Sequence, residues 1–325
     1  MSTRPAGPCG GPGPGSCCWP WRSRLSEWGV VATVKAPQPQ LLAFVAHHLE
    51  LGAARIWLCF DDPADPAAEA LERLPRVTVL RCTLPYWRET CGRRPEKHQN
   101  RQSRNAQHIY AATDLPWLAH LDVDEFLLPD RPIAALLAAA PPDQPMLRAA
   151  PWEALHEPGE PDDIFTARQF RAALPGTSDQ AARDVAFGRY APLLPEGVLS
   201  HAAGKCLFRT GLAGFEPRLH GAFRFGARVV GVPFQPGLAL LHFHAQDPLA
   251  WRERLDFRLA RGAYQYNPAL QAHLLAADDA GRAAFYSRVQ SPDPSIRAQL
   301  AGLGLLRSET LKLREAIARM ETTCI

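Results

Sequence analysis

The sequence predicts an α/β fold in which a mostly parallel sheet is flanked by helices. Between residues 29 and 121, short apolar or β-branched runs alternate with segments that have helical periodicity, and such alternation produces parallel strands joined by helical crossovers. The 325 residues, 46% of them hydrophobic, suffice for a continuous core. An Ala-, Leu- and Arg-rich segment after residue 247 predicts a helical extension at the carboxyl end.

The individual elements follow from these patterns in chain order. A strand is expected at residues 29–34, and Pro39 opens a helix with apolar residues at 41, 42, 45 and 49. The next elements are strands at 55–60, 77–80 and 117–121, with helices at 66–74 and, after a polar segment from 86 to 99, up to residue 113. Beyond residue 140 the alternation is lost, and strands are expected only at 204–208 and 238–243.

Three regions are therefore expected: a disordered tail (1–27), a catalytic domain (28–247) and a helical extension (248–325). The tail contains no apolar run of the length that a secretory signal or membrane span needs. Its Cys17-Cys18-Trp19 cluster leaves open a contact with a membrane surface.

Charge and cysteine content argue against a nucleic-acid-binding protein and against a protein held together by disulfides or a zinc knuckle. The net charge is +3, of which the tail contributes +2, so no basic stripe for nucleic acid is expected. Eight cysteines occur without a C-x-x-C pair, a pattern that predicts reduced thiols in a cytoplasmic protein.

The strongest chemical signal is the pair Asp122 and Asp124, which follows the expected strand 117–121. Ligands of open α/β sheets bind at the carboxyl ends of the strands. In an extended segment both carboxylates point to the same side, where they would hold a divalent cation that bridges to a diphosphate. The alternative is a solvated acidic turn, although apolar runs on both sides of the pair argue against it.

These features combine into a resemblance. The chain is similar to the family 2-like glycosyltransferases in three segments: Val31–Lys35, Leu42–Gly52 and, most specifically, Leu121-Asp122-Val123-Asp124-Glu125-Phe126-Leu127. The resemblance implies the GT-A fold and inverting transfer of a sugar from a nucleoside-diphosphate donor to a glycan or lipid-linked acceptor. A Mn²⁺ or Mg²⁺ cofactor is expected with it. The cytoplasmic location predicted from the cysteines leaves a place at the inner face of a membrane as a further option. The sequence departs from the family at Ala36-Pro37, where similar proteins have Asn-Glu.

The resemblance assigns donor contacts to several residues. Lys35 ends the first strand, and Asp61 or Asp62 would lie near the base and ribose; the alternative for these acids is a helix cap, for which Asp65 is better placed. Lys205 would reach a phosphate, or else be a plain surface lysine.

Two histidines complete the implied donor and metal site. His242 would be the third metal ligand, and its imidazole would favour Mn²⁺ over Mg²⁺. His220 would lie beside the donor. For both, an ordinary hydrogen-bonded histidine is the alternative.

An inverting transfer also needs a general base. Glu153, beside Trp152, is the candidate, with Asp162 and Asp163 as competitors, and each of them could equally be a loop carboxylate. The densest basic stretch of the chain is expected to be a solvated helix face. An anionic lipid, an acidic glycan or the diphosphate are the alternative partners for it. The stretch comprises Arg93, Arg94, Lys97, Arg101 and Arg104.

Two other classes of function remain open. A metal-dependent nucleotidyl or phosphoryl transferase would also use paired carboxylates, but the sequence has no G-x-x-x-x-G-K-[ST] loop. A non-catalytic module that binds a nucleotide sugar or a glycan is the other.

Overall fold

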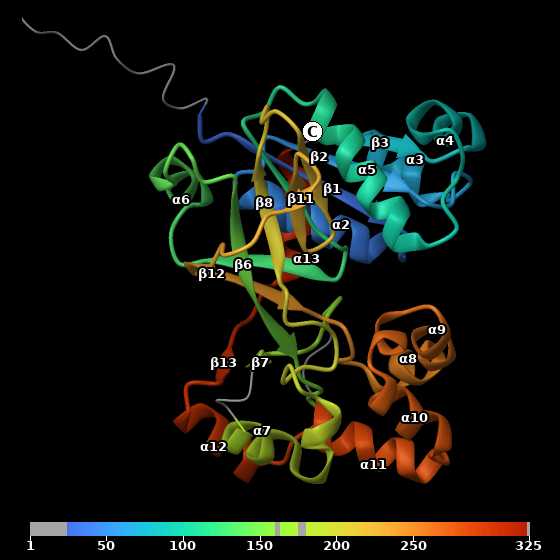
Figure 1. Cartoon of the computed structure of the whole chain (residues 1–325), viewed down its shortest axis with the longest axis vertical. Coiled ribbons are helices and arrows are strands. Elements are labelled where there is room, and N and C mark those ends of the chain that lie inside the picture. Colours follow the sequence, from blue (N-terminus) through green and yellow to red (C-terminus); the bar gives the residue numbers. More distant parts are fainter. Residues whose placement is uncertain (1–24, 160–162, 175–179, 324–325) are drawn as a thin grey trace, which may run out of the picture.

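The computed structural model describes residues 25–159, 163–174 and 180–323 (Figure 1). The first half of the chain alternates strands and helices, in the order β1 (Trp28–Val34), α2 (Gln38–Glu50), β2 (Arg55–Phe60), α3 (Ala67–Glu72), β3 (Val77–Arg81), α4 (Leu84–Cys91), α5 (His98–Ala112), β4 (Trp117–His120), β5 (Glu125–Pro129), α6 (Ile133–Ala139) and β6 (Met146–Ala154). The expected α/β architecture is confirmed.

The second half of the chain contains short strands and then a helical region. It forms, in order, β7 (Gln169–Ala172), α7 (Gln180–Phe187), η2 (Gly188–Leu193), β8 (Lys205–Arg209), β9 (Phe215–Arg218), β10 (Gly221–Arg224), β11 (Ala227–Arg228), β12 (Phe234–His242), α8 (Pro248–Glu253), α9 (Leu255–Ala260), η3 (Ala263–Tyr266), α10 (Pro268–Ala276), α11 (Asp279–Gln290), α12 (Pro294–Gly302), β13 (Leu306–Ser308) and α13 (Leu313–Thr323).

The main sheet is mixed and has the order β13-β7-β6-β8-β4-β1-β2-β3. Strands β3, β2, β1 and β4 are parallel neighbours, as the alternation of strands and helices requires and compatible with a Rossmann-like arrangement. β8 then pairs antiparallel with β4 and with β6. The carboxyl ends of β1, β2, β3 and β4 consequently lie along the same edge of the sheet.

Strand β12 adds a branch to this sheet by lying between β5 and β6. It is antiparallel to β5 and parallel to β6, and His242 at its end is opposite Glu125 on one side and Glu153 on the other. Because Phe243 N donates to the Asp124 carbonyl (2.9 Å), the end of β12 is tied to the acidic segment before β5.

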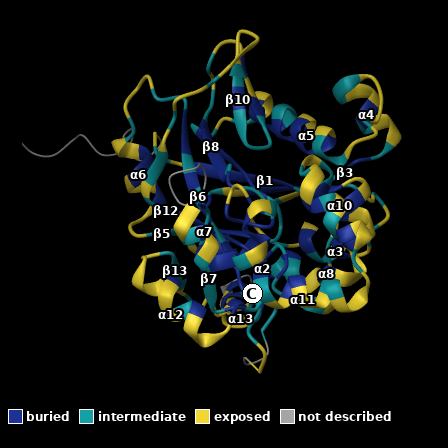
Figure 2. Ribbon diagram, turned by 60° about the horizontal axis from the view of Figure 1, so that its bottom comes forward, coloured by how far each residue is buried: buried dark blue, intermediate teal, exposed yellow. Residues whose placement is uncertain are grey.

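The described residues form three apolar cores, whose extent differs from the expected boundary at residue 247. The core around the sheet includes Leu313, Ala316 and Met320 of α13, which packs against α2. A second core joins the helices α8–α12 to residues 186–199, and a third includes residues of α4, α5 and neighbouring strands. Figure 2 shows buried strands at the centre and exposed outer faces on the helices. The last helix thus belongs to the sheet layer, because its apolar face is covered there.

Two further features bear on the sequence-based expectations. Cys59, Cys82, Cys91 and Cys206 are free thiols, as the lack of paired spacing predicted. Among the described helices, none combines the length and the apolar character needed to cross a membrane. Residues 1–24, which hold most of the expected tail, lie outside the described ranges.

Candidate functional site

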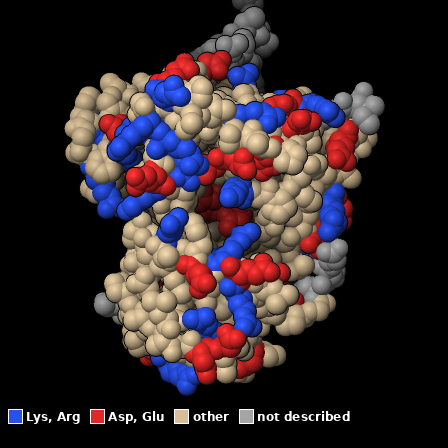
Figure 3. Space-filling model, turned by 90° about the vertical axis from the view of Figure 1, so that its right-hand side faces the viewer, with Lys and Arg blue, Asp and Glu red and all other residues tan. Residues whose placement is uncertain are grey.

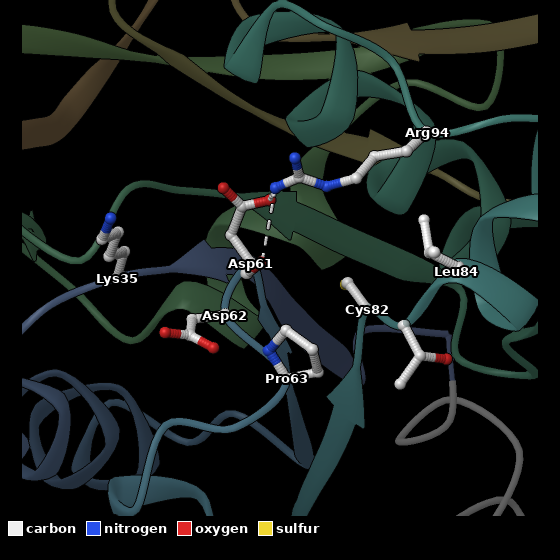
Figure 4. Close-up of a pocket in the computed structure, with 8 residues that line it drawn as sticks. Lys35, Asp61, Asp62, Pro63, Cys82, Leu84 and Arg94 are labelled. Atoms are coloured by element: carbon white, nitrogen blue, oxygen red, sulfur yellow. Dashed lines mark hydrogen bonds and ion pairs between the residues drawn. The ribbon is translucent and has the colours of Figure 1, made fainter.

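A pocket of about 340 Å³ opens at the carboxyl ends of β1, β2 and β3. Lys35 follows β1 and Asp61 and Asp62 follow β2, and all three line the pocket with Arg94, as Figure 4 shows. The structure therefore brings together the three residues that the sequence assigned to donor binding at this edge. Cys82, Thr83 and Leu84, after β3, form the rest of the wall.

Asp61 is held by two arginines. Arg101 donates to both carboxylate oxygens, from Nε at 2.6 Å and Nη2 at 2.7 Å, and Arg94 donates from Nη2 at 3.0 Å. Burial opposes ionisation of Asp61, but these bonds and charges outweigh it and hold the pKa of its carboxyl below the usual value. Asp61 is thus a fixed anion, whereas Asp62 is exposed at the pocket wall.

The expectation of a solvated basic stretch holds for Arg93, Arg94, Lys97 and Arg104, which are exposed, but it is wrong for Arg101. Its side chain is 10% exposed, and its Nη1 also donates to the carbonyls of Pro95 and Glu96. Since α5 must bury one face against the sheet and its first turns contain no apolar residue, polar side chains fill that face. Arg101, Gln102 and Asn105 are all buried there.

Asp122 and Asp124 lie in a tight turn between β4 and β5, and not in an extended segment. Glu125 N donates to the Asp122 carbonyl (3.0 Å), which closes the turn. The strand alternation that was expected to align the two carboxylates therefore does not operate here. Each aspartate has its own surroundings instead.

Both carboxylate oxygens of Asp122 are already engaged. Gln102 Nε2 donates to Oδ1, and Lys205 Nζ donates to Oδ2 at 2.7 Å. Burial opposes the charge of Asp122, but Lys205 outweighs burial and holds the pKa of this carboxyl well below its ordinary value. Asp122 is consequently neutralised from within the protein, unlike a carboxylate that waits for a cation.

Lys205 is a buried cation and not the flexible surface lysine that was expected to reach a phosphate. Its side chain has no exposed surface and lies 2.7 Å from Asp122 Oδ2 and 3.2 Å from Glu125 Oε2. Burial disfavours its charge, yet the two acids outweigh burial and raise the pKa of Lys205. It joins the start of β8 to the acidic turn.

Asp124 has no comparable partner. Its side chain is 33% exposed, and the nearest ion-pairing atom is His242 Nε2, 3.8 Å from Oδ2. Burial, together with the charges of Asp122 and Glu125, raises the pKa of Asp124, and His242 opposes this only in part. A nearby cation would therefore favour the ionised form of Asp124.

Glu125, His201 and His242 form a compact cluster beside Asp124. One ligand atom from each lies within 4.8 Å of the others, and His201 Nε2 is 3.5 Å from Glu125 Oε1. The ring of His220 lies 4.0 Å from that of His201 between centroids, and its Nδ1 is 3.0 Å from the Gly204 carbonyl. His242 thus lies where a metal ligand was expected, whereas Glu125 and His201 were not assigned that role from the sequence.

Gly204 allows the backbone before β8 to pass close to the backbone of β6 at Ala149. Its φ is +66°, and an added Cβ would lie 2.1 Å from the Ala149 carbonyl oxygen. Only glycine is therefore compatible with this backbone, and it allows the chain to pass from His201 to Lys205 directly behind the acidic turn.

Glu153 does not have the surroundings of a general base. It is 1% exposed and accepts hydrogen bonds from Arg171, Leu199 N, Ser200 N and Gln290. Burial opposes its ionisation, but Arg171 and the other donors prevail and lower the pKa of Glu153. A buried, fully bonded and weakly basic carboxylate cannot take a proton from an acceptor hydroxyl.

Of the two competing candidates for the base, Asp163 is also engaged by the protein. Asp163 accepts from Ile164 N at 2.6 Å and from Leu313 N at 3.3 Å, so it caps local backbone and the start of α13. Asp162 lies outside the described residues.

One face of the molecule is hollowed. Figure 3 shows acidic side chains at the floor of a depression between the upper and lower parts of the molecule, with basic side chains along its rim. Such a depression can receive an anionic ligand through its rim while its floor attracts a cation.

No protein-family model and no curated protein matched the sequence of this chain.

Proposed function

We propose that the chain is a metal-dependent glycosyltransferase of the GT-A type. It would transfer a sugar, with inversion, from a nucleoside-diphosphate donor to a glycan or lipid-linked acceptor. The observation that carries the proposal is the alignment of Lys35, Asp61 and Asp62 with the Asp122–Asp124 turn at the carboxyl ends of neighbouring strands.

The spacing of this alignment suits a nucleoside diphosphate. β2 and β4 are separated by β1 alone, so their ends lie roughly 10 Å apart at the usual strand spacing. A nucleoside in the pocket beside Asp62 would direct its diphosphate past Lys35 toward Asp124. A divalent ion at that end would neutralise charge on the leaving diphosphate.

The protein groups have separate roles in this proposal. Arg101 and Arg94 fix Asp61 and so shape the nucleoside pocket. Lys205 balances Asp122 and Glu125, which leaves Asp124 as the acid with the least compensation. A cytoplasmic location, with contact to the inner membrane face for a lipid-linked acceptor, belongs to the same proposal.

Binding of nucleoside diphosphates tests the proposal directly. Thermal unfolding of the purified chain should shift upward with one nucleoside diphosphate in the presence of Mn²⁺, since a ligand of the native state stabilises it by mass action. Asp124→Asn should abolish the Mn²⁺-dependent part of this shift. Asp114→Asn is the matched control, because Asp114 is an exposed acid at the opposite, amino end of β4. An unchanged shift in Asp124→Asn would contradict the proposal.

The burial of Glu153 favours a second candidate, a binding module of the same fold. Among the described carboxylates considered for the role, none is placed as a general base. Release of free nucleoside diphosphate from nucleotide sugars, measured with candidate acceptors, separates the two. Binding without release under all acceptors would favour the module.

A further inference from the structure

The atoms of the Glu125, His201 and His242 cluster come from three distant parts of the chain. Glu125 begins β5, His242 ends β12, and the two are paired across the sheet. His201 precedes β8 and brings Nε2 to 3.5 Å from Glu125 Oε1. The sheet register therefore fixes two members, and the segment after η2 delivers the third.

The two oxygens of Glu125 are treated differently by the protein. Oε2 accepts a hydrogen bond from Asp122 N at 2.8 Å and lies 3.2 Å from Lys205 Nζ. Oε1 is buried and has no hydrogen-bond partner. A buried, unpaired carboxylate oxygen costs free energy unless another group binds it, and this one faces the histidines.

Both imidazoles also present unsatisfied nitrogens. Nδ1 of His201 and Nδ1 of His242 are buried without a hydrogen-bond partner.

From this geometry we propose that Glu125, His201 and His242 hold a divalent transition-metal ion of the Mn²⁺ or Zn²⁺ class, in place of the Asp122–Asp124 pair. Two imidazoles and one carboxylate favour such ions over Mg²⁺. Ligand atoms about 2.1 Å from one tetrahedral ion lie about 3.4 Å from one another. Because the ligand atoms of the cluster lie within 4.8 Å of one another, the cluster needs to contract by up to about 1.4 Å on binding an ion.

The acidic turn lies beside this cluster. Asp124 Oδ2 is 3.8 Å from His242 Nε2, so this carboxylate would lie near a bound ion and would orient a water or a phosphate oxygen there. The inference deepens the proposed function and rests on it for the role of the ion. Ion binding itself needs no nucleotide.

Titration with Co²⁺ as a spectroscopic probe tests the site. On binding, Co²⁺ should show the visible absorption of an ion that is bound by imidazole nitrogens. Added Zn²⁺ should displace the Co²⁺ and remove this absorption, whereas added Mg²⁺ should not. His201→Gln and His242→Gln should each weaken binding by on the order of 100-fold or more, beyond the effect of losing a supporting residue. The matched control is His108→Gln, which alters a half-buried histidine on α5 away from the cluster.

The variants remain informative about folding. The side chain of His201 is 22% exposed, so without metal His201→Gln should unfold at the same temperature as the parent chain. Glu125→Gln gives a third test: it should also weaken Co²⁺ binding, because an amide is a poorer metal ligand than a carboxylate. The inference is overturned if His201→Gln and His242→Gln bind Co²⁺ as tightly as the parent. It is also overturned if Asp124→Asn abolishes Co²⁺ binding while both histidine variants retain it.

The outcomes separate this inference from the transferase proposal. Metal binding lost in the histidine variants, but no nucleotide affinity in the parent, supports the metal site and contradicts the transferase. Nucleotide binding with Mg²⁺ that is unaffected by His201→Gln supports the transferase and contradicts this metal site.

Discussion

Two buried glutamates flank the same histidine and differ in how they are satisfied. In the sheet, His242 lies opposite Glu125 on β5 and opposite Glu153 on β6. Their exposed fractions are 0% and 1%. Burial therefore does not distinguish the two residues, and neither does their position in the sheet.

Hydrogen bonding does distinguish them. Both oxygens of Glu153 accept bonds, from Arg171, Gln290 and two backbone amides. Glu125 uses one oxygen and leaves the other unpaired. A buried carboxylate whose oxygens all accept hydrogen bonds therefore stabilises the fold, whereas one that keeps a free oxygen beside imidazoles has the chemistry of a metal ligand.

Removing Arg171 should give the largest effect. Arg171→Met leaves Glu153 as a buried charge without its cation, so the free energy of unfolding should fall by about 3–5 kcal/mol, measured by urea denaturation. Arg319→Met, which removes an exposed ion pair with Glu50, is the control and should cost less than about 1 kcal/mol. A cost for Arg171→Met as small as that of the control would show that the Glu153 cluster does not anchor the fold.

Removing Lys205 should lower the free energy of unfolding by less than removing Arg171, and a metal ion should reverse part of the loss. Lys205→Met exposes Asp122 and Glu125 to mutual repulsion, but the Asp122 side chain is 25% exposed and water can solvate it. A loss of about 2–3 kcal/mol is expected. Added Zn²⁺ should restore part of this loss, because it binds the native state and returns positive charge near Glu125.

The same addition made to Arg171→Met sharpens the comparison. Zn²⁺ should change the stability of this variant no more than that of the parent chain, since Glu153 has no free oxygen. Recovery of equal size in Arg171→Met and Lys205→Met would contradict the distinction between the two glutamates.

Most strands that build the sheet could be predicted from local pattern. The strands expected at 29–34, 55–60 and 77–80 match β1, β2 and β3 to within a residue or so, because buried parallel strands are short continuous apolar runs. Helix α4 was missed because residues from Tyr86 onward were assigned to a polar segment, and Trp87 is the one buried residue of Leu84–Cys91. β12 begins four residues earlier than expected because Pro236 and Gly237 interrupt its apolar run.

The site was predictable only where it follows directly from strand ends. Lys35, Asp61 and Asp62 come together because parallel strands finish at one edge. His201 depends on a long-range connection between η2 and β8, which no local pattern reports. Arg101 was misjudged because a charged helix residue is usually solvated; the absence of apolar residues from the first turns of α5 was the available signal.

The pH dependence of stability should show the smallest of these effects. It tests whether Glu153 is held as an anion in the folded chain. The lowered pKa of Glu153 means that its contribution to stability is present above its ordinary value of 4.5 and is lost as pH falls through the lower folded value. Glu153→Gln lacks this contribution, because an amide cannot accept from all of these donors. The difference in free energy of unfolding between parent and variant should therefore be constant near pH 7 and narrow below about pH 4.5. Glu50→Gln, at an exposed side chain, is the control. A difference that stayed constant down to pH 3 would show that Glu153 is not held as an anion, and the contrast with Glu125 would then disappear.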